Sequence, residues 1–280
     1  MYTISIIVRT STRYIFLDRA IKDIMNQTYN KWKIILVNDK GDLNKIQKII
    51  NDNNVPKEQY DVINNTGECG LHKAINLGAK AVETEMVVMH DDDDTWDVNF
   101  LSKTIEYLES NSECMGVITH SNKVYEKVVN NQIKIDKIKK FNTDLKDVIS
   151  LYDMIKNNLY SPISFVYRSR VYKEIGYFNE GLEVLEDWEF NIRFLMKYDI
   201  YIIEKALANY HIRKNTNIQE SFKNTITSKR KVHQKYDTLI RNMYLRKDLN
   251  NNQLGIGTIM NILKWSDNRL IKKLKKFIYR

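Results

Sequence analysis

Four consecutive aspartates, Asp91 to Asp94, are the residues of this sequence best suited to do chemistry. Carboxylates this close repel one another at neutral pH, so they either take up protons or attract a cation. Hard oxygen ligands suit Mg²⁺ or Mn²⁺, and Mg²⁺ in particular tends to bring substrate phosphates with it. The alternative is a solvated acidic turn, which is what most acidic runs are. The apolar run at 86–89 predicts a buried strand, and because open α/β sheets bind ligands at strand ends, we favour a site.

Strands and helices alternate before this acidic run. Apolar runs predict strands at residues 4–8, 33–37, 61–63 and 86–89, and apolar residues at helical spacing predict helices at 16–25, 43–50 and 71–81. This alternation predicts a parallel, doubly wound sheet. Thr10, Asp39 and the four aspartates follow the first, second and fourth strands. They should therefore converge on one edge, where such a sheet holds a nucleotide.

The pattern is looser beyond residue 96. We predict helices at 100–108 and 186–197, strands at 116–120 and 161–167, and a hairpin over 123–139 that turns at 130–131. Glu186 and Asp187 open the second of these helices. Acidic residues in a first helical turn also complement the helix dipole, so this pair has a structural interpretation as well as a chemical one.

Composition indicates a globular protein with a substantial core, since 43% of the 280 residues are hydrophobic and 11% are aromatic. No stretch approaches the roughly 18 apolar residues of a membrane span. Strand-like sequence begins at residue 4, so we expect no signal peptide. The two cysteines, Cys69 and Cys114, lack a metal-ligand spacing, which favours a reduced, cytoplasmic chain.

The net charge of +9 is concentrated in the last quarter of the chain. Residues 214–280 contain 16 Lys and Arg against four Asp and Glu, so the preceding residues have 28 basic and 31 acidic side chains. This asymmetry favours a local partner such as an anionic membrane over a nucleic acid. Apolar residues in the tail form one helical stripe flanked by cations: Ile259, Leu263, Leu270, Leu274 and Ile278. Such a helix either lies at the cytoplasmic face of a membrane or packs on the protein body.

Five stretches in order resemble the family 2 inverting glycosyltransferases of the GT-A fold, over about residues 3 to 213. They are SIIVRT (5–10), NQTY with IILVND (26–29 and 34–39), the glycine at 70 with KAINLG (73–78), MHDDDDTW (89–96), and GYFNE with EDWE (176–180 and 186–189). The resemblance implies a Rossmann-like mixed, mostly parallel sheet flanked by helices, with a C-terminal helical appendage. Residues 1–96 would form the nucleotide-sugar-binding half and residues 97–213 the acceptor-binding half of one GT-A domain. Residues 214–280 would form a basic helical region.

The same resemblance implies roles for the residues around the donor. Asp39 would accept a hydrogen bond from a uracil ring, and Thr10 would line the same pocket. Asp91 and Asp92 would hold the ribose and diphosphate side of the donor. Lys73 and Asn76 would lie near the diphosphate or the sugar, although a solvated helix face is an equal alternative for both.

Two further roles concern the reaction itself. Asp93 would coordinate Mn²⁺ or Mg²⁺, and Asp187 would be the general base that takes the proton of the acceptor hydroxyl. The family often has Tyr-Arg-x-His after its last strand, whereas this chain has Tyr-His-Ile-Arg at 210–213. It stays open whether His211, as a metal ligand, or Arg213 takes the place of the family's histidine. Ser11 replaces the aromatic partner of the base.

We therefore predict a metal-dependent, inverting glycosyltransferase that acts in glycan or polysaccharide biosynthesis. The donor would be a nucleotide sugar, with a UDP-sugar favoured, and the transferred unit a hexose or N-acetylhexosamine. The acceptor would be the hydroxyl of a glycan, a lipid-linked molecule or a protein.

Two alternatives compete with this prediction. A nucleotidyltransferase would need a glycine-rich phosphate loop after the first strand, but RTSTR at 9–13 contains no glycine. A non-catalytic sugar- or membrane-binding module of the same fold would not need both Asp93 and Asp187.

Overall fold

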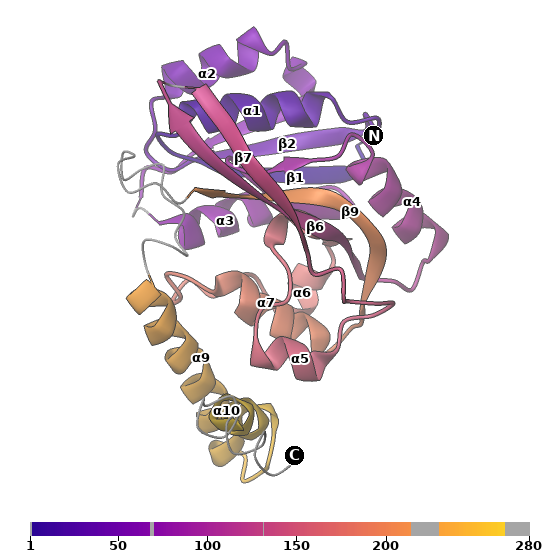
Figure 1. The fold of residues 1–280 in the computed structure, drawn as a ribbon, viewed down its shortest axis with the longest axis vertical. Coiled ribbons are helices and arrows are strands. Elements are labelled where there is room, and N and C mark those ends of the chain that lie inside the picture. Colours follow the sequence, from indigo (N-terminus) through magenta and orange to yellow (C-terminus); the bar gives the residue numbers. More distant parts are fainter. Residues whose placement is uncertain (1, 68–69, 131, 214–229, 267–280) are drawn as a thin grey trace.

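A mixed sheet forms the centre of the protein (Figure 1). The computed structural model describes residues 2–67, 70–130, 132–213 and 230–266. Within these residues the sheet has nine strands. Eight of them follow the order β3-β2-β1-β4-β8-β6-β9-β5, and the ninth, β7, pairs with β6 outside this order. The strands are β1 (Ile4–Thr10), β2 (Trp32–Asn38), β3 (Tyr60–Asn64), β4 (Met86–Asp91), β5 (Thr95–Trp96), β6 (Gly116–Val129), β7 (Gln132–Phe141), β8 (Phe165–Arg168) and β9 (Ile200–Arg213).

The first four strands form the parallel half of the sheet. β1 pairs in parallel with both β2 and β4, and β3 pairs in parallel with β2. Their side chains alternate between two cores: Ile6 of β1 and Val88 of β4 belong to one, while Ile7 and Met89 belong to the other. Because both faces are covered, these strands are apolar throughout, as buried parallel strands are. The predicted mixed, mostly parallel sheet flanked by helices is confirmed.

Helices cover both faces of the sheet. The helices are α1 (Tyr14–Met25), α2 (Leu43–Asp52), α3 (Leu71–Lys80), α4 (Phe100–Ser110), α5 (Leu151–Lys156), α6 (Val171–Ile175), α7 (Glu186–Leu195), α9 (Arg230–Asn250) and α10 (Ile256–Ser266), with short 3-10 turns at Lys57–Gln59 and Pro162–Ser164. Side chains from α1, α2 and α4 build one core, and side chains from α3, α5, α6, α7, α9 and α10 build the other. None of the described helices is long and apolar enough to cross a membrane.

A glycine sets the distance between α3 and the sheet. A Cβ atom at Gly78 would lie 2.5 Å from Cγ2 of Ile7 and 3.2 Å from Cγ2 of Val37. No real Cβ contact is as short as the first of these, so only a hydrogen fits between the helix and the two strands. This close packing holds the first turn of α3 near the ends of β1 and β2.

The second half of the chain departs from the sequence prediction. The strand predicted at 116–120 continues to Val129, where it forms the expected hairpin with β7; turn residue 131 lies outside the described residues. The strand predicted at 161–167 begins only at Phe165, because residues 162–164 form a 3-10 turn. β9, β5, α5 and α6 were not predicted. The register of β9 against β6 shifts twice near His120, and such irregularities interrupt the alternation from which strands are recognised.

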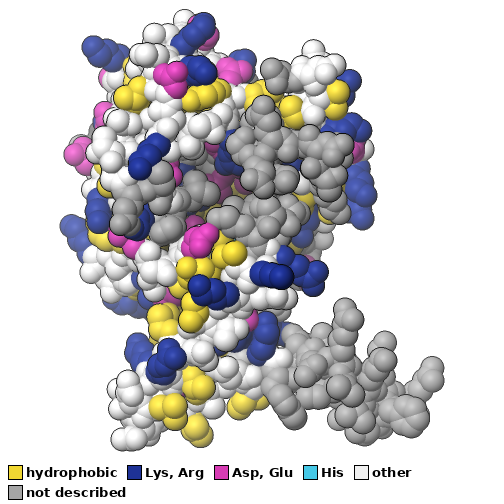
Figure 2. Space-filling model, turned by 90° about the vertical axis from the view of Figure 1, so that its left-hand side faces the viewer, with side chains coloured by type: hydrophobic (Ala, Val, Ile, Leu, Met, Phe, Trp, Pro, Cys, Tyr) yellow, Lys and Arg dark blue, Asp and Glu magenta, His cyan; other side chains and the backbone are white. Residues whose placement is uncertain are grey.

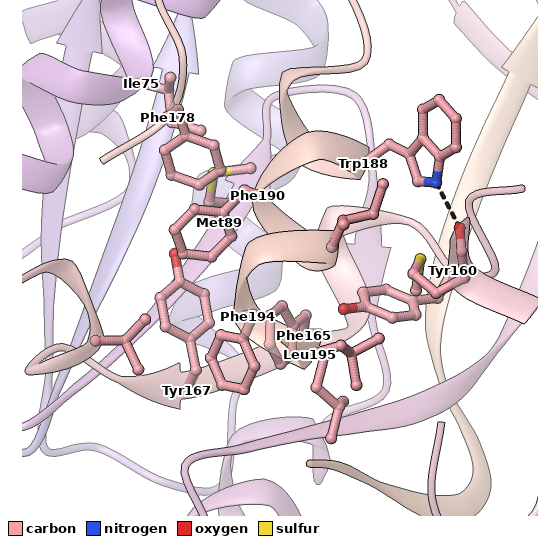
Figure 3. Packing of buried hydrophobic residues seen from close by; sticks show 14 of the residues in the cluster. Ile75, Met89, Tyr160, Phe165, Tyr167, Phe178, Trp188, Phe190, Phe194 and Leu195 are labelled. Carbon is pink, nitrogen blue, oxygen red and sulfur yellow. Dashed lines mark hydrogen bonds between the residues drawn. The ribbon is translucent and has the colours of Figure 1, made fainter. Parts of the chain in front are cut away.

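Aromatic side chains fix α7 against the sheet (Figure 3). The rings of Phe178 and Phe190 stack with their centroids 4.4 Å apart, and Phe165 contacts Phe194 edge to face at 5.2 Å. The indole Nε1–H of Trp188 donates to the carbonyl oxygen of Met154 at 2.6 Å. A buried indole N–H needs such a partner, so this bond sets the rotation of the first turn of α7, where Asp187 lies.

The C-terminal helices α9 and α10 pack on this same region. The Arg241 guanidinium lies 5.1 Å from the ring of Trp188 and donates to the carbonyl oxygen of Met260 at 2.7 Å. The hydroxyl of Tyr244 donates to Oε1 of Glu189 at 3.3 Å. The predicted helical appendage is therefore present, and as far as residue 266 it shares the core of the body.

The apolar stripe predicted in the tail is divided by this packing. Leu263 is buried in the core, as the alternative interpretation required, whereas Ile259 is 43% exposed. Leu270, Leu274 and Ile278 lie outside the described residues, as does Cys69, while Cys114 is a buried free thiol. Leu249, Leu254 and Ile262 are also exposed. Figure 2 shows hydrophobic side chains at the surface of the lower part of the molecule.

We predict that Arg241→Met lowers the free energy of unfolding by about 3 kcal/mol, measured by urea denaturation. The guanidinium also donates to the carbonyl of Lys156 and to Asp237, so the variant leaves buried acceptors without donors. Lys264→Met is the matched control, because it removes the exposed second partner of Asp237 and should change stability by about 0.5 kcal/mol or less. Equal effects of the two variants would contradict a structural role for Arg241.

Candidate active site

The predicted donor residues meet where β1, β2 and β4 end. The hydroxyl of Thr10 donates to Oδ2 of Asp92 at 3.0 Å, and the backbone N–H of Asp39 donates to the carbonyl oxygen of Thr10 at 2.8 Å. All three side chains are at least nine-tenths buried. The convergence predicted from the alternation of strands and helices is therefore observed.

Asp39 joins three segments at this edge. Its Oδ1 accepts a hydrogen bond from Nδ2 of Asn65 at 2.9 Å, and its Oδ2 accepts one from the backbone N–H of Gly70 at 3.0 Å. The loop after β2 also lies against the loop after β1, since a Cβ atom at Gly41 would lie 2.0 Å from the carbonyl oxygen of Ser11. The Asp39 carboxylate is thus held in place by β2, the segment after β3 and the start of α3.

Arginines pair with the first three aspartates of the acidic run. Asp91 accepts from Nη2 of Arg9 at 2.6 Å. Asp92 accepts from Arg13, whose Nη1 also donates to Oδ2 of Asp93 at 2.9 Å. The same Oδ2 accepts from Nη2 of Arg213. The run is therefore neither a solvated turn nor an open group of like charges.

Burial and these partners shift the pKa values of Asp92, Asp93 and Asp94 in different directions. Burial raises the pKa of Asp92 to about 6, although Arg13 opposes this shift. Burial acts in the same direction on Asp93, but Arg13 and Arg213 outweigh it and hold the pKa of Asp93 well below its usual range. Burial raises the pKa of Asp94 well above its usual range, and Oδ1 of Asp94 accepts the backbone N–H of His211 at 2.8 Å. Of these three aspartates, Asp93 is thus the one most firmly held as a carboxylate.

Glu126 of β6 is buried next to the acidic run and accepts hydrogen bonds from side chains of α1 and β9. It accepts from Nη1 of Arg19 at 2.7 Å, from Nδ1 of His211 at 2.6 Å and from Nη1 of Arg213 at 2.8 Å. Burial raises the pKa of Glu126, but the hydrogen bonds from His211 and Arg19 outweigh it and lower the value to about 2. Glu126 is therefore ionised and holds β6, β9 and α1 together.

Arg213 and His211 lie at the end of β9 in the reverse of the family's usual order, and of these two it is Arg213 that contacts Asp93. The second ring nitrogen of His211, Nε2, lies 2.9 Å from Oγ1 of Thr95, so Glu126 and Thr95 engage both nitrogens. Burial lowers the pKa of His211, and the bond to Glu126 only partly offsets this. In this arrangement His211 supports the site from behind. Its role as a metal ligand stays a prediction.

The site fits a cation that arrives together with phosphate oxygens. Within the described part of the chain, no three His, Cys, Asp or Glu side chains converge into a ready-made metal cage. Mg²⁺ and its relatives are commonly held by one or two carboxylates plus substrate phosphates. Asp93 suits this arrangement, because no described residue donates to its Oδ1.

Asn76 and Lys73 both belong to α3. Asn76 is buried, and its amide nitrogen donates to the carbonyl oxygen of Phe178 at 2.8 Å and to Oε1 of Glu180 at 2.9 Å. These bonds fasten the segment before α7 to α3. Lys73 is half-buried in the first turn of α3. The donor contacts predicted for both residues stay predictions.

Asp187 lies in the first turn of α7, two residues after a residue with a strained backbone. Leu185 adopts the left-handed conformation, with φ of 65°, which costs a bulky residue about 1–2 kcal/mol. Nδ2 of Asn158 donates to Oδ2 of Asp187 at 2.7 Å, and Asn158 is itself contacted by Asn191 at 3.3 Å. Burial raises the pKa of Asp187. The carboxylate is thus oriented and made more basic, as a general base requires.

Arg9 connects the two acidic groups of the site. Its guanidinium bonds to Asp91 of β4 and lies 3.4 Å from Oε1 of Glu186 at the start of α7. Burial raises the pKa of Glu186 to about 7 against the opposing charge of Arg9. The acidic run and the carboxylates of α7 therefore share one buried arginine, which places Asp187 beside the predicted donor site.

Five residues of this site were not identified from the sequence: Arg9, Arg13, Arg19, Glu126 and Asn158. A charged residue at a position where the strand pattern predicts a buried side chain could have pointed to Glu126, which lies between Val124 and Val128. The three arginines and Asn158 have no comparable local signal.

The fold and this edge define an α/β protein with buried acidic residues at the carboxyl ends of its parallel strands. Residues 5–176 match the sequence model of glycosyl transferase family 2. Since this match covers more than half of the chain, the protein belongs to that family.

One curated protein and one solved structure match most of this chain but only part of their own length. An uncharacterized glycosyltransferase of Haemophilus influenzae is 25% identical over 194 residues, which are 67% of this chain and 58% of that protein. The structure of S. aureus TarS residues 1–349 in complex with UDP-GlcNAc superimposes with a TM-score of 0.56 at 21% identity, covering 76% of this chain and 59% of that one. This chain therefore spans less than two thirds of either.

A third similarity comes from an archaeal structure. The mannosyltransferase PcManGT of Pyrobaculum calidifontis, in complex with GDP-Man and Mn²⁺, gives a TM-score of 0.56 at 13% identity and covers 77% of this chain and 59% of that one. At such identities the two solved structures show a shared fold.

We predict that Glu186→Gln stabilises the protein above pH 7. Because the pKa of Glu186 is about 7 in the folded protein against 4.5 in its ordinary state, ionisation opposes folding. The wild type should lose stability as the pH rises from 4.5 to 7, and the variant should exceed it by about 2 kcal/mol at pH 8 and by nothing at pH 4.

Denaturant unfolding across this pH range measures the difference. Glu204→Gln is the control, because the pKa of Glu204 is lowered by its bond from Lys146. A gain for Glu186→Gln that is the same at pH 4 and pH 8 would rule out the ionisation argument.

Proposed function

We propose that this protein transfers a sugar, with inversion, from a nucleotide sugar to an acceptor hydroxyl. Membership of glycosyl transferase family 2 supports the class of reaction. The observation that best supports the site is the Arg9 contact, which joins Asp91 of the acidic run to Glu186, the neighbour of Asp187. One edge of the sheet therefore combines acids suited to the donor with an acid suited to deprotonate the acceptor.

A UDP-sugar is the donor that we favour. The fixed Asp39 carboxylate can accept the N3–H of a uracil ring, and Thr10 and Asp92 lie beside it. The structural neighbours were solved with UDP-GlcNAc and with GDP-Man, which supports a nucleotide sugar carrying a hexose or an N-acetylhexosamine.

Departure of the nucleoside diphosphate requires compensation of a growing negative charge. A Mn²⁺ or Mg²⁺ ion bound by Asp93 would act there as a Lewis acid. The arginines next to Asp92 and Asp93 add positive charge at the same edge. Lys73, at the first turn of α3, remains the candidate for a further contact to the diphosphate.

Asp187 would take the proton of the acceptor hydroxyl as that oxygen attacks the sugar. Asn158 and the backbone N–H of Trp188 both donate to this carboxylate, which orients its remaining lone pairs toward an acceptor hydroxyl in our proposal. A single base that acts on the face opposite the leaving group inverts the anomeric centre and needs no covalent intermediate. The acceptor would be a hydroxyl of a growing glycan, of a lipid-linked molecule or of a protein.

The competing functions are not equally supported. Family membership disfavours a nucleotidyltransferase. A non-catalytic module of the same fold is distinguished from an enzyme by turnover alone.

We predict that Asp187→Asn lowers sugar transfer more than a hundredfold and leaves UDP affinity unchanged, because the base acts only on the acceptor proton. A panel of UDP-sugars with release of UDP as the signal measures the first quantity, and calorimetry measures the second. Glu186→Gln is the matched variant, for which we expect a loss of less than about tenfold. A larger loss for Glu186→Gln than for Asp187→Asn would identify Glu186 as the base.

We further propose that the C-terminal tail places the enzyme at an anionic membrane surface on the cytoplasmic side. Residues 267–280 contain six cations, namely Arg269, Lys272, Lys273, Lys275, Lys276 and Arg280. Each cation near such a surface adds about 1 kcal/mol of binding energy. The exposed side chains of Leu254 and Ile262 lie on the preceding segment.

Co-sedimentation with vesicles rich in phosphatidylserine measures this binding. The full chain should pellet at low salt, and a chain that ends at Ser266 should remain in the supernatant. The shorter chain is a fair comparison because it retains Met260 and Leu263, which anchor α10 in the core. Equal sedimentation of the two would exclude the tail as the membrane contact.

A further inference from the structure

The carboxylate of Asp93 is held by two arginines from distant parts of the chain. Arg13 comes from the loop between β1 and α1 and also binds Asp92, whereas Arg213 is the last residue of β9. Arg213 is fully buried, while the side chain of Arg13 is 18% exposed. Both guanidinium groups lie at the edge that the proposed function assigns to the donor diphosphate.

The ion pairs of the acidic run and Glu126 balance one another, with Asp94 and Glu186 as further acids beside them. Asp91, Asp92, Asp93 and Glu126 provide up to four negative charges, and Arg9, Arg13, Arg19 and Arg213 provide four positive ones. A free divalent cation at Oδ1 of Asp93 would be repelled by the two guanidinium groups bound to Oδ2, and a free diphosphate would have to compete with the aspartates for those same groups. Each ligand alone therefore disturbs a paired arrangement, whereas a cation and a diphosphate together do not.

We propose that Arg13 and Arg213 are exchange residues of the donor site. In the donor-free protein they neutralise Asp92 and Asp93, and when a nucleoside diphosphate arrives with a divalent cation they turn their N–H groups to the diphosphate oxygens. Asp93 is thereby released to the cation. This inference rests on the proposed donor site and adds the residues that bind the diphosphate and the order in which charges exchange partners.

The two arginines have the contacts that such an exchange requires. A guanidinium group offers paired N–H donors that match phosphate as well as carboxylate oxygens. Nη1 of Arg213 stays bound to Glu126 at 2.8 Å, and its guanidinium carbon lies 4.4 Å from the centre of the Phe16 ring. Arg213 can therefore release Asp93 through Nη2 without losing its buried partners. Arg13 contacts Asp92 and Asp93 from a loop with partial access to solvent.

The exchange makes the two ligands cooperative. Because the arginines compete with a cation for Asp93 and with the aspartates for a diphosphate, each ligand removes the obstacle to the other. Binding free energies are reciprocal, so UDP must raise the affinity for Mn²⁺ by the same factor as Mn²⁺ raises the affinity for UDP.

The test measures Mn²⁺ binding by electron paramagnetic resonance, with and without saturating UDP, and UDP binding by calorimetry in the presence of Mn²⁺. We expect the wild type to bind Mn²⁺ at least about tenfold more tightly with UDP than without it. Arg13→Met should bind Mn²⁺ alone more tightly than the wild type and UDP with Mn²⁺ more weakly. A shift of about tenfold in each direction corresponds to one charge-assisted hydrogen bond.

The opposite signs of these shifts separate the proposal from a loss of folding, since an unfolded variant binds both ligands more weakly. Arg213→Met should behave like Arg13→Met; if the loss of its bond to Glu126 unfolds the protein, Arg13→Met decides alone. Lys146→Met removes one exposed positive charge, paired with Glu204 far along the chain from the acidic run, and should change neither affinity.

Two results would overturn the proposal. The first would overturn the exchange alone, and the second would overturn the proposed donor site as well. If the wild type binds UDP with Mn²⁺ but Arg13→Met leaves or lowers the affinity for Mn²⁺ alone, the arginines are structural and the proposed function stands. If the wild type binds neither UDP nor Mn²⁺ under any combination, the donor site itself is wrong and the exchange fails with it.

Discussion

Buried carboxylates at the ends of parallel strands require positive partners, and this constraint organises the rest of the molecule. An unpaired buried charge costs several kcal/mol, so four acids beside one another would oppose folding unless they were compensated. Arg9, Arg13 and Arg213 provide this compensation to Asp91, Asp92 and Asp93, and Arg19 pairs with the neighbouring Glu126. The acidic run is therefore stabilised by arginines that the chain brings to the same edge.

Those arginines come from separate elements, so the same contacts join the two halves of the sheet. Arg213 reaches Asp93 across 120 residues of sequence, and Glu126 of β6 receives arginines from both α1 and β9. The parallel pairing of β6 with β9 is what presents Glu126 and Arg213 to each other, through a register of partners that includes these two residues. Residues of β6 and β9, in the irregular second half of the sheet, thus hold Asp93 in the regular first half in place.

The core that contains α7, α9 and α10 positions the proposed base. Aromatic stacking holds α7 against the sheet, and Trp188 lies between the carbonyl of Met154 and the guanidinium of Arg241. Because Asp187 precedes Trp188 directly, α9 and α10 contribute to the position of that carboxylate. The C-terminal segment up to residue 266 is for this reason part of the folded body that positions Asp187.

Local patterns of the sequence were sufficient to predict the first half of this fold and much of its site. Continuous apolar runs identified β1, β2 and β4, and the polar residues that follow them, Thr10, Asp39 and Asp91 to Asp94, do meet at one edge. Tertiary structure alone decided which side chain pairs with each acid: Arg13, Arg19 and Asn158 had no local signal, Glu126 had only that of a charge at a buried strand position, and Arg213 rather than His211 contacts Asp93. The physical reason is that strand and helix periodicity depends on neighbours a few residues apart, whereas the partner of a buried acid is fixed by contacts between segments some 30 to 120 residues apart.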